Sequence, residues 1–246
     1  TQTHTEHFTN PLYLESGRIL EPYDITYETY GELNDDKSNV IVVCHALTGS
    51  HHAAGVYEGE VKAGWWDGFI GSGKALDTDK YFVICSNVIG SCFGSTGPMS
   101  LQHPHHEYYR YKFPVVTIKD MVKAQRILFD RLDIHRVYAI VGGSMGGMQA
   151  LQFAVHYPNF AQKIIAMATT YATQPWAIAF NKVAQESILK DPEFKQGYYD
   201  PEVIAQNGLA GMAVGRMAGH ISFLSHDSMQ SKFGREYKRT DGLYEL

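Results

Sequence analysis

Four short runs of apolar and β-branched residues limit what this chain can fold into. The runs are NVIVVC, KYFVICSN, RVYAIVGG and KIIAMATT, at residues 39–44, 80–87, 136–143 and 163–170. Each run is continuous rather than alternating, which is typical of a strand buried on both faces of a sheet. Helical patterns separate the last three runs, and the first of these helices begins with a capping-box pattern at Thr117 and Asp120. The sequence therefore predicts an α/β fold with a mostly parallel sheet flanked by helices.

The two ends of the chain differ from this central pattern. Residues 12–33 contain β-forming residues interrupted by Ser-Gly and Glu-Pro, which predicts two or three antiparallel strands. Residues 174–230 are helical in pattern and contain no buried-strand run, which is typical of a cap or lid. We therefore expect the sheet domain at residues 1–172 and a helical lid at residues 173–246, truncated before the last strands of the core.

Composition limits the partners and the cellular location to be expected for this protein. The net charge of −5 gives no reason to expect nucleic acid or an anionic membrane as a partner. Three cysteines form no disulfide framework, so reduced thiols in the cytoplasm are expected. The first ten residues are polar, and no apolar run approaches the roughly 18 residues that span a bilayer. We expect a cytoplasmic protein.

The third run ends in a serine that lies between pairs of glycines. Gly142-Gly143-Ser144-Met145-Gly146 matches the G-x-S-x-G pattern of a nucleophile elbow, where a strained strand-to-helix turn exposes a serine hydroxyl. A glycine-rich turn of another α/β fold, such as a phosphate-binding loop, is the alternative. Neither G-x-x-x-x-G-K-[ST] nor G-x-G-x-x-G is matched at this turn. Ser144 is therefore the predicted nucleophile.

A second motif follows the first run directly. Acyl transfer needs two N–H donors for the oxyanion, one from the residue after the nucleophile and one from the loop after an earlier strand. His45-Ala46-Leu47-Thr48-Gly49 is that loop, so the backbone N–H groups of Leu47 and Met145 are the predicted oxyanion hole. The alternative is a plain turn from strand to loop that contains a core histidine.

With both motifs present, the chain resembles the homoserine O-acetyltransferases, acyltransferases of methionine biosynthesis with the α/β-hydrolase fold. The similar stretches follow the family's order over nearly the whole chain. They are CHALTG (44–49), GWWDGFIGSGKALDTDKYFVICSNVIG (64–90), FGSTGP (93–98), FPVVTIKDMVKAQ (113–125), GGSMGGMQA (142–150), AIAFN (177–181) and KFGRE (232–236).

The resemblance implies a reaction in two steps through a covalent intermediate. Ser144 would take an acetyl group from acetyl-CoA and pass it to the side-chain hydroxyl of L-homoserine, using the same oxyanion hole twice. Acetyl-CoA would be a co-substrate, and no metal or bound cofactor is implied. We also expect a homodimer that forms through the lid.

The sequence departs from the family pattern at two points. In this fold the triad Asp or Glu and then the His follow the nucleophile, and the family places them beyond the lid, where this chain stops. We therefore expect an N-terminal fragment that is inactive by itself. The family also has an Arg that holds the homoserine carboxylate, and Gln185 stands at that position. Either another cation such as Arg216 binds the carboxylate, or the acceptor is not homoserine.

Other assignments remain open. His156, His220 and His226 follow the nucleophile and are weak alternatives for the missing base. His103-Pro104-His105-His106 invites a metal site, but a surface loop is favoured. An esterase or lipase of the same fold would use water as the acceptor, and a non-catalytic hydrolase-like module would only bind a ligand.

Overall fold

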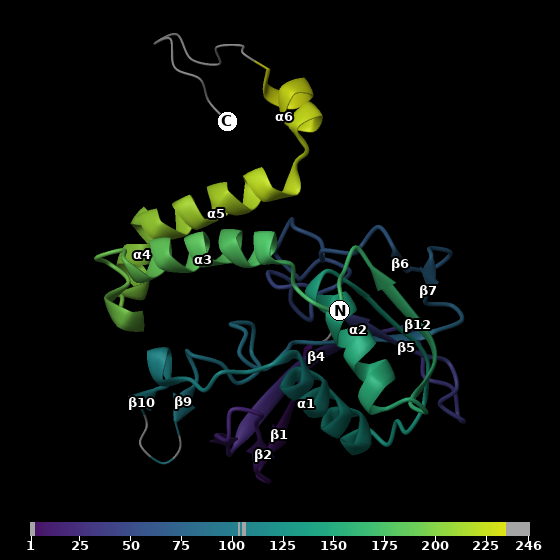
Figure 1. Cartoon of the computed structure of the whole chain (residues 1–246). Helices are drawn as coiled ribbons and strands as arrows, with labels where there is room; N and C mark the ends of the chain where they lie inside the picture. Colours follow the sequence, from purple (N-terminus) through teal and green to yellow (C-terminus); the bar gives the residue numbers. More distant parts are fainter. Residues whose placement is uncertain (1–2, 103, 105–106, 235–246) are drawn as a thin grey trace. The chain divides into compact units, whose positions relative to one another are not determined.

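A six-stranded sheet is the centre of the computed structural model, which describes residues 3–102, 104 and 107–234 (Figure 1). The strands lie in the order β1-β4-β8-β5-β11-β12. Their bounds are β1 Thr3–Phe8, β4 Tyr23–Tyr30, β8 Phe82–Ser86, β5 Val40–Cys44, β11 Val137–Gly143 and β12 Ala161–Met167. The last four are parallel to one another, while β1 pairs antiparallel with β4, and β4 with β8. The mostly parallel sheet predicted from the four apolar runs is confirmed.

The N-terminal part contains more strands than the sequence predicts. A short hairpin of β2 (Leu12–Tyr13) and β3 (Ile19–Leu20) precedes β4, as expected for residues 12–33. Strand β1 was not predicted because its sequence, THTEHF, is polar. It lies at the edge of the sheet, where backbone pairing with β4 replaces the apolar pattern of a buried strand.

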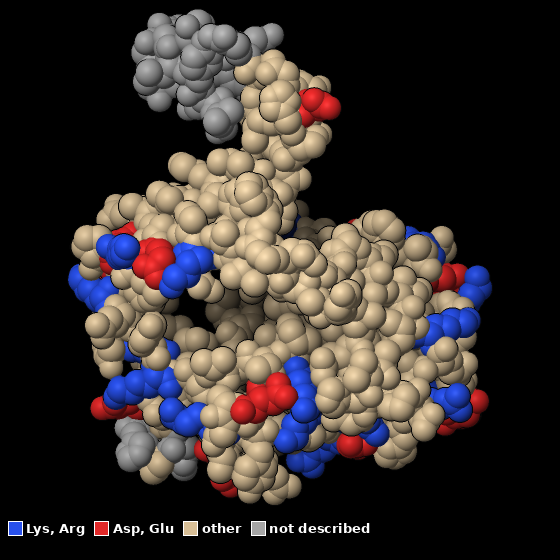
Figure 2. Space-filling model, viewed as in Figure 1, with Lys and Arg blue, Asp and Glu red and all other residues tan. Residues whose placement is uncertain are grey.

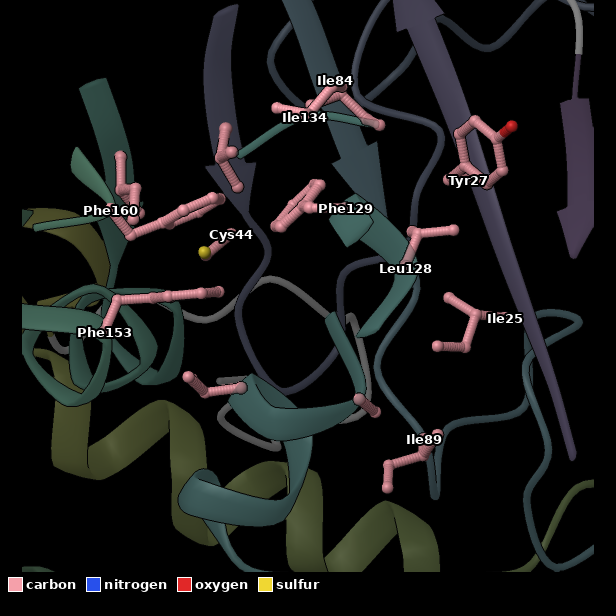
Figure 3. Packing of buried hydrophobic residues seen from close by; sticks show 14 of the residues in the cluster. Ile25, Tyr27, Cys44, Ile84, Ile89, Leu128, Phe129, Ile134, Phe153 and Phe160 are labelled. Carbon is pink, nitrogen blue, oxygen red and sulfur yellow. The ribbon is translucent and has the colours of Figure 1, made fainter. Parts of the chain in front are cut away.

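Two helices cover one face of the sheet. Helix α1 (Ile118–Arg131) begins with the predicted capping box, in which the Asp120 N–H donates to Thr117 Oγ1 at 3.2 Å. Helix α2 (Met145–His156) follows β11 and contacts α1. Between the helices and the sheet, the rings of Phe129 and Phe153 lie 5.5 and 5.6 Å from that of Phe160 (Figure 3). This aromatic cluster holds both helices against the strands.

A long loop segment covers the opposite face. Residues 51–81 contain only two short strands, β6 (Ile70–Gly71) and β7 (Leu76–Asp77). Ala53, Ala54 and Ile70 from this segment are buried against strand residues such as Val43 and Val83. Three further short elements, β9 (Leu101–Gln102), β10 (Glu107–Tyr108) and η1 (Arg110–Lys112), lie in the loop before α1.

A buried carboxylate ties this loop to strands β1 and β4. Glu28 of β4 is fully buried and accepts hydrogen bonds from the hydroxyls of Tyr30, Tyr57 and Thr3. His52 Nδ1 lies 3.1 Å from the same carboxylate. Burial raises the pKa of Glu28, but these hydrogen bonds outweigh it and leave the pKa below its usual value. The carboxylate therefore stays ionised and fixes the loop that follows the HALTG motif.

The chain divides after Tyr171 into two units, the sheet unit and the helical unit, and the described residues of the second unit, 172–234, are mostly helical. Its elements are α3 Pro175–Leu189, η2 Lys195–Gly197, α4 Pro201–Asn207, α5 Ala210–Phe223 and α6 His226–Phe233. Gly215 lies against Ala184, and Gly211 lies against Ser187, so α3 and α5 run antiparallel. The Ser187 hydroxyl donates to the Gly211 carbonyl at 2.9 Å. That this unit acts as a lid remains a prediction.

Charged side chains of both signs are mixed on the surface of the protein. Figure 2 shows Lys and Arg side chains interspersed with Asp and Glu over the visible face. Pairs such as Lys182 and Glu186, with 2.5 Å between Nζ and Oε1, are exposed and contribute little to stability. Among the helices of the described residues, none is both long enough and apolar enough to cross a membrane.

The contact between α3 and α5 predicts the effect of two glycine substitutions. A Cβ at Gly211 would lie 2.1 Å from the Ser187 carbonyl oxygen, whereas a Cβ at Gly219, in the same helix, has nothing within 4 Å. Gly211→Ala should lower the free energy of unfolding by about 1–3 kcal/mol because the helices must separate. Gly219→Ala should be neutral or stabilising by up to about 1 kcal/mol. Urea unfolding followed by circular dichroism measures both, and equal stabilities would contradict the close contact.

Candidate active site

Ser144 lies on the sharp turn between β11 and α2. Its φ of 54° and ψ of −121° are unfavourable for a residue with a side chain. The residue is exposed, and β11 directly before it is buried apart from partly exposed Tyr138 and Gly143. This strained turn is the geometry that the G-x-S-x-G pattern predicts.

Glycines on either side let the turn close. A Cβ at Gly142 would lie 2.2 Å from the Gly146 carbonyl oxygen, and one at Gly146 would lie 2.0 Å from the Cys44 carbonyl oxygen. No real Cβ contact is this short, so the backbones of β11, α2 and β5 approach each other only because both residues are glycine. Gly143 is different, since the nearest atom to a Cβ there is the Met167 carbonyl oxygen at 3.7 Å.

Hydrogen bonds connect the turn to the strand on its other side. The Ser144 N–H donates to the Met167 carbonyl of β12 at 3.1 Å. The Ser144 carbonyl accepts from the Thr169 hydroxyl at 2.7 Å and from the Met148 N–H at 3.1 Å. Ser144 is thereby held at the carboxyl ends of β5, β11 and β12, the edge at which parallel sheets bind their ligands.

The two predicted oxyanion residues border the same hollow. Leu47 follows β5 by three residues, and Cys44 at the end of β5 pairs with Gly142 of β11. Leu47 and Met145 both line a pocket of about 260 Å³. Its other lining residues are Val88, Ile89, Gly90, Ser91, Phe113, Pro114, Val116 and Met121. No charged side chain is among them, so the pocket suits an uncharged group.

His45, which opens the HALTG motif, is a structural residue. It is fully buried, and its Nε2 accepts the Val88 N–H at 3.0 Å. Its Nδ1 lies 2.8 Å from the Ala46 carbonyl oxygen and must therefore carry the ring proton. Burial and the nearby His51 lower the pKa of His45, although the bond to Ala46 raises it. His45 is thus a neutral core histidine, which was the alternative interpretation of this residue in the HALTG motif. It is unsuited to act as a base.

Among the described residues of the sheet unit, no base is hydrogen-bonded to Ser144. Within the part of the chain that the structure describes, the Ser144 hydroxyl has no hydrogen bond. His156 lies at the other end of α2, about 18 Å away by helix geometry, and contacts Gln152. His220 packs against Phe233, and His226 begins α6 in the helical unit. Of the candidate metal ligands, His103, His105 and His106 lie outside the described residues.

Gln185 and Arg216 lie on the same side of the α3–α5 pair. Each follows by one residue a position in the contact between these helices, Ala184 in α3 and Gly215 in α5. Each step along a helix rotates the side chain by about 100°, and in an antiparallel pair the two steps lead to the same side. Both residues are exposed, and neither makes a hydrogen bond or ion pair within the described residues.

A larger hollow lies elsewhere on the sheet unit. It measures about 470 Å³ and is lined by Asp35, Asp36, Lys37, Ser38, Asp133, His135, Arg136 and Gln162. Most of these residues come just before β5 and β11, at the amino ends of the strands. It therefore lies at the opposite ends of the strands from Ser144. Among the described residues, no group of three or more His, Cys, Asp or Glu side chains is arranged to hold a metal ion.

Comparison with known proteins agrees with this architecture. The family model of the alpha/beta hydrolase fold matches residues 39–238, so this is an alpha/beta hydrolase fold protein. A homoserine O-acetyltransferase of Sulfurimonas autotrophica is 86% identical over 245 residues. The match covers 100% of this chain and 67% of that protein, so the chain spans about two thirds of its relative's length. The chain belongs to the homoserine O-acetyltransferase family, and the resemblance found in the sequence is confirmed.

Solved structures of two kinds share the fold. A homoserine O-acetyltransferase from Bacillus anthracis superposes with a TM-score of 0.87 at 32% identity, covering 97% of this chain and 64% of that one. Esterase E22 superposes with a TM-score of 0.85 at 31% identity, covering 97% and 67%. The same scaffold therefore serves proteins named for transfer to homoserine and for ester hydrolysis.

The glycine contacts at the elbow predict a difference between two neighbouring substitutions. Gly146→Ala should lower the free energy of unfolding by about 1–3 kcal/mol, because its Cβ would overlap the Cys44 carbonyl oxygen. Gly143→Ala, in the same turn, should stay within about 0.5 kcal/mol because its Cβ has ordinary contacts. Urea unfolding of both variants tests this, and a Gly146→Ala protein as stable as Gly143→Ala would contradict the close approach of α2 and β5.

Proposed function

We propose that this protein transfers an acetyl group from acetyl-CoA to the side-chain hydroxyl of L-homoserine through an acetyl-Ser144 intermediate. The observation that carries the proposal is the exposed Ser144 on a strained elbow, next to a pocket lined by Leu47 and Met145. The name of the Sulfurimonas relative supports the choice of acceptor and acyl group.

In the first half-reaction, Ser144 Oγ attacks the thioester carbonyl of acetyl-CoA. Its proton passes to a base and then to the departing CoA thiolate, which leaves as the thiol. In the second, the homoserine hydroxyl attacks acetyl-Ser144, gives up its proton, and Ser144 recovers one. In this fold the base is a His that follows the nucleophile and an Asp or Glu in chain order. No residue described in the sheet unit is placed to take that role.

Both half-reactions pass through a tetrahedral oxyanion. We place it between the N–H groups of Leu47 and Met145, the second of which opens helix α2. The first N–H groups of a helix have no partner within it, and the helix dipole favours negative charge there. A donor of this kind is worth roughly 10²- to 10³-fold in kcat.

The pocket favours acetyl over a longer acidic acyl group. Its ten lining residues include no Lys, Arg or His, so a succinyl carboxylate there would be desolvated without a counter-charge. An acetyl methyl group has no such cost. The reaction as proposed needs no metal and no bound cofactor.

We assign the homoserine carboxylate to Arg216 in the helical unit. Gln185 stands where the family has an Arg. Arg216 lies on the same side of the α3–α5 pair and at about the same height along the helix axes, because the preceding residues, Ala184 and Gly215, lie against each other. Arg216 is exposed and makes no ion pair within the described residues, so its guanidinium can form a bidentate pair with a carboxylate, which Gln cannot. This unit would act as the lid of the site.

We also propose that the helical unit supplies the contact of a homodimer. Several of its large apolar side chains are strongly exposed, among them Trp176 at 73%, Met217 at 63% and Phe223 at 86%. Apolar surface of this kind is stabilised when a second copy covers it.

Substitution of the nucleophile gives the direct test. Incubation of the complete gene product with acetyl-CoA should add one acetyl group at Ser144, detected by peptide mass spectrometry. Ser144→Ala should abolish this label and lower transfer to homoserine by roughly 10⁴-fold or more, with unchanged unfolding. If simple esters are cleaved while acetyl-CoA leaves Ser144 unmodified, the protein is an esterase and the transferase proposal fails.

The carboxylate assignment predicts a change confined to the second substrate. Arg216→Gln should raise the KM for homoserine by roughly 10- to 100-fold, because a charge-assisted pair is lost. Acetylation of Ser144 by acetyl-CoA should continue at the wild-type rate. Adding Gln185→Arg to this variant should recover part of the affinity. An unchanged KM in Arg216→Gln would exclude this residue as the carboxylate partner.

A further inference from the structure

A buried pair of glutamine side chains joins the two segments that carry the proposed oxyanion donors. Gln149 of α2 and Gln125 of α1 are 0% and 2% exposed. Gln149 Nε2 donates to the His45 carbonyl at 3.0 Å and to the Met145 carbonyl at 3.3 Å. One amide group therefore bonds both to the loop after β5 and to the first residue of α2.

The orientation of this amide is set by its partners. Backbone carbonyls only accept hydrogen bonds, so the Nε2 of Gln149 must face His45 and Met145. Its Oε1 then faces Gln125, whose Nε2 donates to it at 2.7 Å. The Gln125 Oε1 accepts in turn from the Cys44 thiol, with 3.9 Å between sulfur and oxygen. In each of these hydrogen bonds the donor and the acceptor are fixed, and a flipped amide would bring oxygen against oxygen.

Stability alone does not require such a pair. The side chains around it form an apolar core that includes Leu128 and Phe153. A neutral hydrogen bond contributes only about 1 kcal/mol net, and well-packed apolar side chains of similar volume serve a core equally well. What an apolar pair cannot supply is a directional bond from one side chain to both segments.

We propose that Gln149, oriented by Gln125, is a positioning residue that sets the separation of the Leu47 and Met145 N–H groups. The inference rests on the proposed function, because this separation matters only if the two groups share an oxyanion. Donors must lie within about 2.7–3.1 Å of that oxygen. A displacement of about 1 Å in such a site can cost 10²-fold in rate. Gln149 bonds to the carbonyl of Met145 itself and to the residue two before Leu47.

The test replaces Gln149 in the complete gene product and separates kcat from KM. Gln149→Met keeps the length of the side chain but removes both its donor and its acceptor. We expect kcat to fall by roughly 10- to 100-fold, while the KM values for acetyl-CoA and homoserine stay within about twofold, because only the transition state uses the hole. Gln149→Glu keeps the shape but places a carboxylate oxygen against two carbonyls, and should lower kcat at least as much.

Phe153→Leu is the matched control. Phe153 lies one turn further along α2, is 1% exposed and packs in the apolar core against the rings of Phe129 and Phe160. It should lower the free energy of unfolding by an amount similar to Gln149→Met, yet keep kcat within about twofold. Equal losses of kcat in the two variants would show that loosening α2 explains the effect, and would overturn the proposal.

Gln125→Met keeps the proposal testable if Gln149→Met does not fold. It leaves Gln149 in place but removes the donor that orients it, so kcat should fall less than in Gln149→Met, again with unchanged KM values. The double variant should be no slower than Gln149→Met, since both act through one amide. An unchanged kcat in Gln125→Met and Gln149→Met, or a rise in KM instead, would overturn the inference. Absence of acetyl-Ser144 in the wild-type protein would instead contradict the proposed function.

Discussion

The approach of the Gly146 α-carbon to the Cys44 carbonyl is the contact on which the candidate site depends. A Cβ at this position would lie 2.0 Å from that oxygen, so helix α2 can begin directly beside β5 only with glycine there. Because the helix starts so close to the strand, Met145 in its first turn and Leu47 in the loop after β5 line the same pocket. The strained φ of 54° at Ser144 follows from the same geometry, and the pairing of β11 with β5 and β12 holds it.

Much of the sheet unit could be predicted from the sequence because its signals are local. The continuous runs that became β5, β8, β11 and β12 carry the mark of burial on both faces, and Thr117 with Asp120 marks the start of α1. Strand β1 could not be found in this way. Its residues alternate between exposed and partly buried, and what stabilises them is pairing with β4, about twenty residues later in the chain.

Some residues of the candidate site could likewise be predicted from local motifs, and others depend on tertiary packing. Ser144, Leu47 and Met145 follow from motifs and their spacing, since each motif lies directly after a recognisable strand. The placement of Gln185 beside Arg216 required the antiparallel packing of α3 on α5, which no local pattern encodes. The roles of Gln125 and Gln149 were missed for a related reason. A lone glutamine on the apolar face of a predicted helix looks like an imperfection in the pattern, and only the fold shows that two of them meet.

Glycine and glutamine have different structural roles at the site. Glycine removes the side chains that would keep β5 and α2 apart, but a contact between bare backbones leaves their relative position weakly determined, because no side chains interlock there. A directional hydrogen bond supplies what packing cannot, and Gln149 provides it through the His45 and Met145 carbonyls. His45 extends the same framework by accepting the Val88 N–H, which fixes one wall of the pocket. In the proposed oxyanion hole, the backbone N–H groups would then be held in place by buried side chains behind them.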